Sequence, residues 1–128
     1  MLKLMIVDDS NVIRSKIQRA YDSEKFTVVA VASSGVEAIE QFHQFQPDVI
    51  TMDLTMPRMD GITCIEKLME LNPRLLILVV SALSDQATGI EALQKGANGF
   101  LLKPFSEEDL RLALDELTEH LWAEKRYV

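Results

Sequence analysis

Cysteine is almost absent from this 128-residue sequence, in which Cys64 is the single example. One thiol excludes an internal disulfide, and His43 and His120 have no partner ligands at the spacing of a zinc site. Glycine and proline are also scarce, with 5 and 4 residues, and no stretch rich in either predicts a disordered linker. The length and the 48% of hydrophobic residues indicate one globular domain.

Long apolar runs and an excess of positive charge are lacking as well. The longest apolar run, residues 75–80, is far shorter than the roughly 20 residues that a membrane-spanning helix requires. A formal net charge of -7 opposes attraction to phosphate backbones and anionic lipid, so we expect no direct binding to nucleic acid or membrane. The sequence opens on a core-like run instead of a charged leader, and we expect a cytoplasmic location.

Five short apolar runs predict five strands, at residues 2–7, 27–32, 49–52, 75–80 and 99–102. The runs are continuously apolar and do not alternate, which is typical of parallel strands covered on both faces. Helical patterns separate them. This alternation predicts a three-layer α/β domain in which right-handed crossovers join parallel neighbours.

The expected helices have recognisable start signals. These are Ser10 or Asn11, the capping pair Ser34 and Glu37, Asp60-Gly61, Ser84, and the capping pair Ser106 and Asp109. We expect the fourth helix to bury Ile90 and Leu93 and to end at Gly96.

Candidate functional side chains follow four of the five predicted strands, at the edge where ligands gather in sheets of this kind. They are Asp8 and Asp9, Asp53, Ser81 and Lys103. Two carboxylates about 4 Å apart repel by roughly 4 kcal/mol at an effective dielectric near 20, so three on one edge require a cation. Their oxygen atoms favour Mg²⁺ over softer metals.

Asp53 ends the run Val49–Met52, where a fixed carboxylate oxygen could attack an incoming phosphorus atom and form an acyl phosphate. Such a transfer needs alignment and neutralisation of charge on the moving group, which Mg²⁺ and Lys103 would supply. Ser81 could add a hydroxyl hydrogen bond.

Four fragments, each at a predicted strand end and in this order, carry a family resemblance. They are Asp8-Asp9-Ser10, Asp53-Leu54-Thr55-Met56-Pro57 running into Met59-Asp60-Gly61, Ser81-Ala82, and Lys103-Pro104-Phe105. Over nearly its whole length the chain resembles the response-regulator receiver domains of two-component signalling. The resemblance implies a flavodoxin-like (βα)5 sandwich with a five-stranded parallel sheet of order 2-1-3-4-5.

The resemblance also implies roles for the site residues. Asp53 would be the phosphoacceptor, and Lys103 would pair with the phosphoryl oxygens. The Mg²⁺ ligands would be Asp8, Asp9, Asp53 and the backbone carbonyl of Thr55. Ser81 and Phe100 would form a conformational switch, and the Lys103-Pro104 peptide would be cis. Thr55 and Leu83 differ from the best-known chemotaxis pattern, which leaves the lifetime of the phosphoryl group open.

The function implied is that of a phosphorylation-activated switch. A sensor histidine kinase or phosphotransfer protein would donate the phosphoryl group, and a downstream protein would bind the face of the fourth helix, fifth strand and fifth helix. The chain would catalyse its own phosphorylation and dephosphorylation without turning over an external substrate. We expect a receiver domain at residues 1–121, a tail or linker start at 122–128, and a monomer or phosphorylation-dependent dimer.

Other interpretations use the same residues. The chain could be the receiver portion of a larger transcription regulator, although Asn98-Gly99 lacks the paired acids frequent there. A haloacid-dehalogenase-like phosphatase would need an acid where Thr55 stands, and a flavodoxin would need a phosphate loop after the first strand. Taken singly, Asp8 and Asp9 could be helix caps and Phe100 could be core filler.

Overall fold

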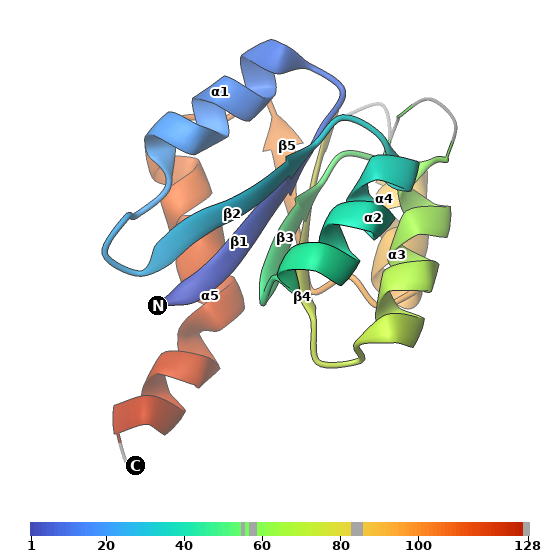
Figure 1. Cartoon of the computed structure of the whole chain (residues 1–128). Helices are drawn as coiled ribbons and strands as arrows, with labels where there is room; N and C mark the ends of the chain where they lie inside the picture. The colour runs from blue at the N-terminus through green and yellow to red at the C-terminus, as the bar shows by residue number, and fades with distance from the viewer. Residues whose placement is uncertain (55, 57–58, 83–85, 127–128) are drawn as a thin grey trace.

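The computed structural model describes residues 1–54, 56, 59–82 and 86–126, in which strands and helices alternate from one end to the other (Figure 1). The elements are β1 Leu2–Val7, α1 Asn11–Ala20, β2 Phe26–Ala32, α2 Gly35–Phe45, β3 Val49–Met52, α3 Gly61–Leu71, β4 Leu76–Ala82, α4 Gln86–Gln94, β5 Gly99–Lys103 and α5 Glu107–Arg126. The expected strands are confirmed to within two residues at each end.

The strands form one parallel sheet of order β2-β1-β3-β4-β5, which confirms the expected topology. The register decides which residues meet at its edge. Val7 pairs with Met52, so the chain leaves β1 and β3 at the same level. Ala82 pairs with Lys103, which brings the ends of β4 and β5 level in the same way.

Helices cover both faces of the sheet, with α1 and α5 on one side and α2, α3 and α4 on the other (Figure 1). Successive strand residues point to opposite faces, and the core is accordingly divided into two apolar clusters. Val79, for example, belongs to the cluster under α2, α3 and α4, and Val80 to the cluster under α1 and α5. All of β3 is buried, as its continuous apolar run predicted.

Side-chain hydrogen bonds cap the first turns of helices that follow the strands. Ser106 and Asp109 exchange hydrogen bonds with each other's backbone N–H groups, both at 3.0 Å, so this predicted capping box is confirmed. The Ser34 hydroxyl accepts from Glu37 N at 3.2 Å, and the Glu37 carboxylate accepts from the Ser33 hydroxyl at 3.1 Å.

The orientation of α4 differs from the prediction. Ile90 and Leu93 were expected to be buried, but they are 60% and 44% exposed. Among the described side chains of this helix, Gly89 and Ala92 are the buried ones, because α4 approaches the sheet through its smallest residues. Gly96, with φ of 124° in the left-handed region, follows the helix as expected.

The last helix is longer than the sequence indicated. Leu110, Leu114 and Leu117 are buried and Leu121 packs against them, and the helix continues to Arg126 beyond the edge of the sheet (Figure 1). Segment 122–128 was expected to be a tail or a linker start. Its described part, residues 122–126, belongs to the helix α5. Among the described residues, no helix is both long and apolar enough to cross a membrane.

The lone thiol of Cys64 is fully buried in α3, and this burial raises its pKa to about 12, with a smaller contribution from the charge of Asp60. An unfolded thiol ionises near pH 8.5, so the unfolded chain releases a proton between about pH 8.5 and 12 that the folded chain keeps. The thiol's contribution to stability therefore falls as pH rises through this window.

We expect native Cys64 to react about 10³-fold more slowly with a thiol reagent at pH 8 than it does in denaturant, because only the thiolate reacts. Reaction progress followed with a chromogenic disulfide checks this. Equal rates in the native and denatured states would show that the thiol is accessible.

Candidate functional site

The carboxyl edge of the sheet gathers three acidic side chains. Asp8 follows β1 and Asp53 follows β3, and Asp53 N donates to Val7 O at 2.9 Å, which ties the two strand ends together. One carboxylate oxygen from each of Asp8, Asp9 and Asp53 lies within 4.8 Å of the others. The structure thus brings together the three acids that the sequence placed on one edge.

Asp8 is the most deeply buried of the three, at 1% exposure. Its Oδ1 accepts from Ser10 N at 2.9 Å, just before the start of α1. Its Oδ2 is buried and lies 3.0 Å from the ammonium of Lys103, but completes no hydrogen bond to any described residue. A buried carboxylate oxygen without a hydrogen bond lowers the stability of the fold unless a cation neutralises its charge.

Lys103, at the end of β5, also lies 3.8 Å from Asp53 Oδ1. One ammonium beside three carboxylates leaves two formal negative charges on the edge, and two of the acids, Asp8 and Asp53, are buried where water screens poorly. The donor atoms are all oxygens, the ligands of hard divalent cations. The residues present therefore fit a metal ion.

Ser81 and Phe100 lie on one face of the sheet. Phe100 pairs with Val79, and Ser81 stands two residues further along β4, so both side chains point to the side covered by α4. Ser81 is buried, and Phe100 is partly buried against the apolar cluster on that side. Thr55 and Leu83 lie outside the described residues, and the assignment of the Thr55 carbonyl stays a prediction. The Lys103-Pro104 peptide is cis, as expected.

Gly61 packs against the acidic edge, a position that the sequence interpretation did not predict. Asp60-Gly61 was read as the start of a helix and as part of a fragment that carries the family resemblance, and Gly61 was given no role in the site. Asp60 does cap α3, accepting from Thr63 N at 2.8 Å. However, Gly61 N also donates to Leu54 O at 2.9 Å, and its Cα lies directly against the backbone of Asp53 and Leu54. The same dipeptide therefore caps the helix and packs against the acidic edge, and a close backbone approach of this kind leaves no mark in sequence spacing.

Comparison with known proteins decides the family. The model of the family described as "Response regulator receiver domain" matches residues 4–115, most of the chain. The chain belongs to this family. The receiver domain is 37% identical over 116 residues to the chemotaxis protein CheY of Listeria monocytogenes, in a match covering 91% of this chain and 98% of that protein. Family membership favours the receiver interpretation over the phosphatase and the flavodoxin.

Larger proteins also contain domains like this receiver. A protein-glutamate methylesterase/protein-glutamine glutaminase of Hydrogenovibrio crunogenus is 38% identical over 123 residues, which are 94% of this chain and 32% of that protein.

Solved structures agree with the fold. The receiver superimposes on the REC domain of AraT, a response regulator from Geobacillus stearothermophilus, with a TM-score of 0.90 and 32% identity, covering 97% of this chain and 98% of that one. It also matches a chain of the CheX-CheY-BeF3-Mg²⁺ complex from Borrelia burgdorferi, with a TM-score of 0.84 and 30% identity, covering 91% and 88%.

Proposed function

We propose that this receiver domain is a phosphorylation switch that accepts a phosphoryl group on Asp53 in a Mg²⁺-dependent reaction. The observation that carries the proposal is the meeting of Asp8, Asp9 and Asp53 within 4.8 Å, with the Lys103 ammonium 3.0 Å from Asp8 and 3.8 Å from Asp53. The donor is a sensor histidine kinase or a phosphotransfer protein, whose phosphohistidine carries a phosphoryl group of suitable reactivity.

In the reaction, a carboxylate oxygen of Asp53 forms a bond to phosphorus while the bond from phosphorus to the donor's nitrogen breaks and the nitrogen keeps the electron pair. Asp53 is suited to attack because its backbone N–H is fixed by Val7 O and its side chain is buried. Lys103 neutralises charge on the phosphoryl oxygens. Hydrolysis of the acyl phosphate by water returns the carboxylate.

Asp8, Asp9, Asp53 and the backbone carbonyl of Thr55 are the proposed ligands of Mg²⁺. The ion, when bound, would supply positive charge opposite the phosphoryl oxygens. Asp8 Oδ2, which is buried and completes no hydrogen bond to a described residue, supports this assignment. The Borrelia burgdorferi complex, which is similar to this chain and is described as containing BeF3 and Mg²⁺, supports the choice of ion.

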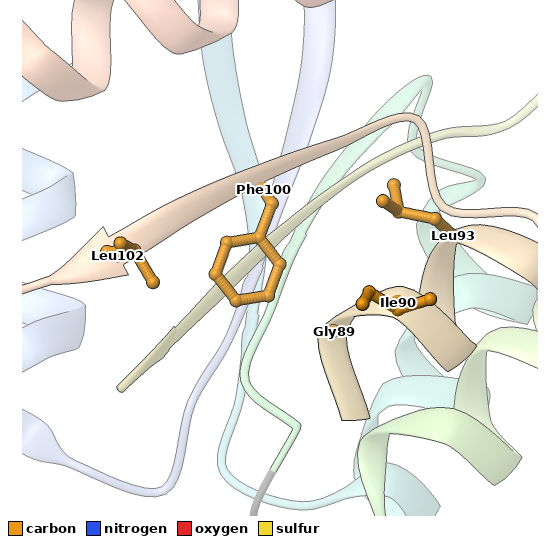
Figure 2. Close-up of a pocket in the computed structure, with 5 residues that line it drawn as sticks. All are labelled: Gly89, Ile90, Leu93, Phe100 and Leu102. Carbon is orange, nitrogen blue, oxygen red and sulfur yellow. The ribbon is translucent and has the colours of Figure 1, made fainter. Parts of the chain in front are cut away.

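Ser81 and Phe100 are the proposed switch. Phosphorylation draws the Ser81 hydroxyl toward Asp53 and frees space on the sheet face that both residues share, into which the ring of Phe100 turns. The result is a population shift at the face formed by α4, β5 and α5, where a downstream protein binds. Ile90, Leu93 and Leu102 are exposed there and line a cavity of about 390 Å³ with Gly89 and Phe100 (Figure 2).

The remaining assignments complete this proposal. The receiver comprises residues 1–121, acts in the cytoplasm, and is a monomer or a phosphorylation-dependent dimer. The second candidate function is that of the receiver portion of a larger regulator, which the match to one third of a methylesterase favours.

The test is incubation with acetyl phosphate and Mg²⁺, followed by intact mass measurement. Wild type should gain one phosphoryl group, whereas Asp53→Asn should lose at least about 10²-fold in labelling, because the amide is not a nucleophile. Glu70→Gln, at an exposed position of α3, is the matched control and should label like wild type. Equal labelling of Asp53→Asn would refute the assignment.

A further inference from the structure

The ring of Phe100 occupies space that a side chain at position 89 would need. Figure 2 shows the ring extending from β5 toward the turn of α4 that carries Gly89. A Cβ placed on Gly89 would lie 2.2 Å from Phe100 Cε2 and 2.8 Å from Cδ2, well below any normal carbon–carbon contact. The three nearest atoms it would meet all belong to the ring. The ring and a residue larger than glycine therefore cannot both keep these places.

The backbone of α4 gives no other reason for glycine here. Gly89 lies inside the helix, and its φ is not in the left-handed region that favours glycine. A glycine inside a helix is less favourable than alanine, because its backbone loses more conformational freedom on folding. The sequence thus has an unfavourable residue in α4 at a position that lies directly against the Phe100 ring.

The sheet offers the ring a second direction. Phe100 pairs with Val79, and Ser81 follows two residues later on the same face, toward the acidic edge. Motion toward Ser81 would take the ring away from Gly89. The backbone of Gly89 would then be exposed at the bottom of the cavity that Ile90, Leu93 and Leu102 also line.

We propose that Gly89 is a positioning residue that holds Phe100 in its resting orientation over α4 and becomes the floor of a deepened cavity when the ring leaves. This inference rests on the switch role proposed above for Phe100. Gly89 sets the equilibrium between the two ring positions, and by linkage it sets the affinity of the acidic edge for a phosphoryl group.

The direct test is Gly89→Ala. The added methyl group displaces the ring of Phe100 from Gly89. The conformation that binds a phosphoryl group, which is a minor species in unliganded wild type, then becomes the major one. The apparent affinity for BeF3⁻ in the presence of Mg²⁺, measured by calorimetry, should then rise about tenfold. In protein containing 4-fluorophenylalanine, the resonance of residue 100, assigned with Phe100→Leu, should move in unliganded Gly89→Ala toward its position in BeF3⁻-bound wild type.

A double-mutant cycle separates positioning from a general effect on α4. Phe100→Ala removes the ring, and adding Gly89→Ala to it should leave BeF3⁻ affinity unchanged within about twofold, because nothing remains to displace. A tenfold gain that persisted without the ring would overturn the inference, and so would unchanged or weaker binding by Gly89→Ala itself.

Wild type provides a test even if Gly89→Ala does not fold. Its Phe100 resonance should shift on addition of BeF3⁻ and Mg²⁺, and a stationary resonance would show that the ring never leaves Gly89.

Failure of the proposed function can be distinguished from failure of this inference. If wild type bound no BeF3⁻, or Asp53→Asn bound it equally well, the phosphoryl site itself would be wrong. Normal wild-type binding without an effect of Gly89→Ala would remove only the role of Gly89.

Discussion

Lys103→Met is expected to slow phosphorylation of Asp53 by about 10²-fold while tightening Mg²⁺ binding about tenfold. Removing one group that stabilises transition-state charge commonly costs 10²- to 10³-fold in rate. The metal affinity should move in the opposite direction, because the Lys103 ammonium lies 3.0 Å from Asp8 and 3.8 Å from Asp53 and so competes with a cation for the same oxygens. A tenfold change in Mg²⁺ affinity corresponds to only part of the roughly 4 kcal/mol by which two unit charges 4 Å apart interact at an effective dielectric near 20.

The same variant should be less stable without metal and should recover when Mg²⁺ is added. Asp8 is 1% exposed and would lose the ammonium beside it, and removing one partner of a buried ion pair costs about 3 kcal/mol. Acetyl phosphate labelling rates, Mg²⁺ calorimetry and melting with and without Mg²⁺ measure the three effects. Lys95→Met, which removes an exposed lysine elsewhere, is the control for net charge. Unchanged Mg²⁺ affinity in Lys103→Met would contradict the proposed arrangement of charges.

Gly61→Ala is expected to lower the free energy of unfolding by about 2 kcal/mol and to reduce labelling of Asp53 at least tenfold. A Cβ at this position would lie 2.5 Å from Leu54 Cα and 2.6 Å from Asp53 O, both backbone atoms that no rotamer change can move away. The acidic edge must shift to admit the methyl group, and displacement by even a fraction of an ångström misaligns a nucleophile.

Denaturant melts and initial labelling rates measure the two effects of Gly61→Ala. Thr63→Ala is the matched control, since it changes an exposed side chain on the same turn of α3 and leaves the Thr63 N–H to Asp60 bond in place. Wild-type labelling by a folded Gly61→Ala protein would show that the approach of α3 does not position Asp53.

The sheet and the acidic cluster could be predicted from the sequence because both follow from local patterns. Continuous apolar runs indicate buried parallel strands, and residues that follow such strands meet at one edge. Asp8, Asp9, Asp53 and Lys103 were found in this way and lie together. The strand order and the cis Lys103-Pro104 peptide were expected only from family resemblance, because neither is determined by local pattern.

The orientation of α4 could not be predicted because the pattern of large apolar residues pointed to the wrong face. Ile90 and Leu93 are the bulky side chains of this helix, and ordinarily the bulky face is buried. Here the helix packs through Gly89 and Ala92. Because these residues are small, the helix can lie close to the Phe100 ring and the sheet. The packing of Gly61 against the acidic edge was not predicted for the same reason, since the space available at a residue depends on the assembled fold.

The most direct test of the central claim is to locate the phosphoryl group on the chain. An acyl phosphate is reduced by borohydride to an alcohol, so a phosphorylated aspartate is converted to homoserine and can be identified by peptide mass. After incubation with acetyl phosphate and Mg²⁺, we predict homoserine at position 53 and its loss when Mg²⁺ is chelated. Modification at any other residue, or at position 53 without a requirement for the metal, would contradict a site built from Asp8, Asp9, Asp53 and Lys103.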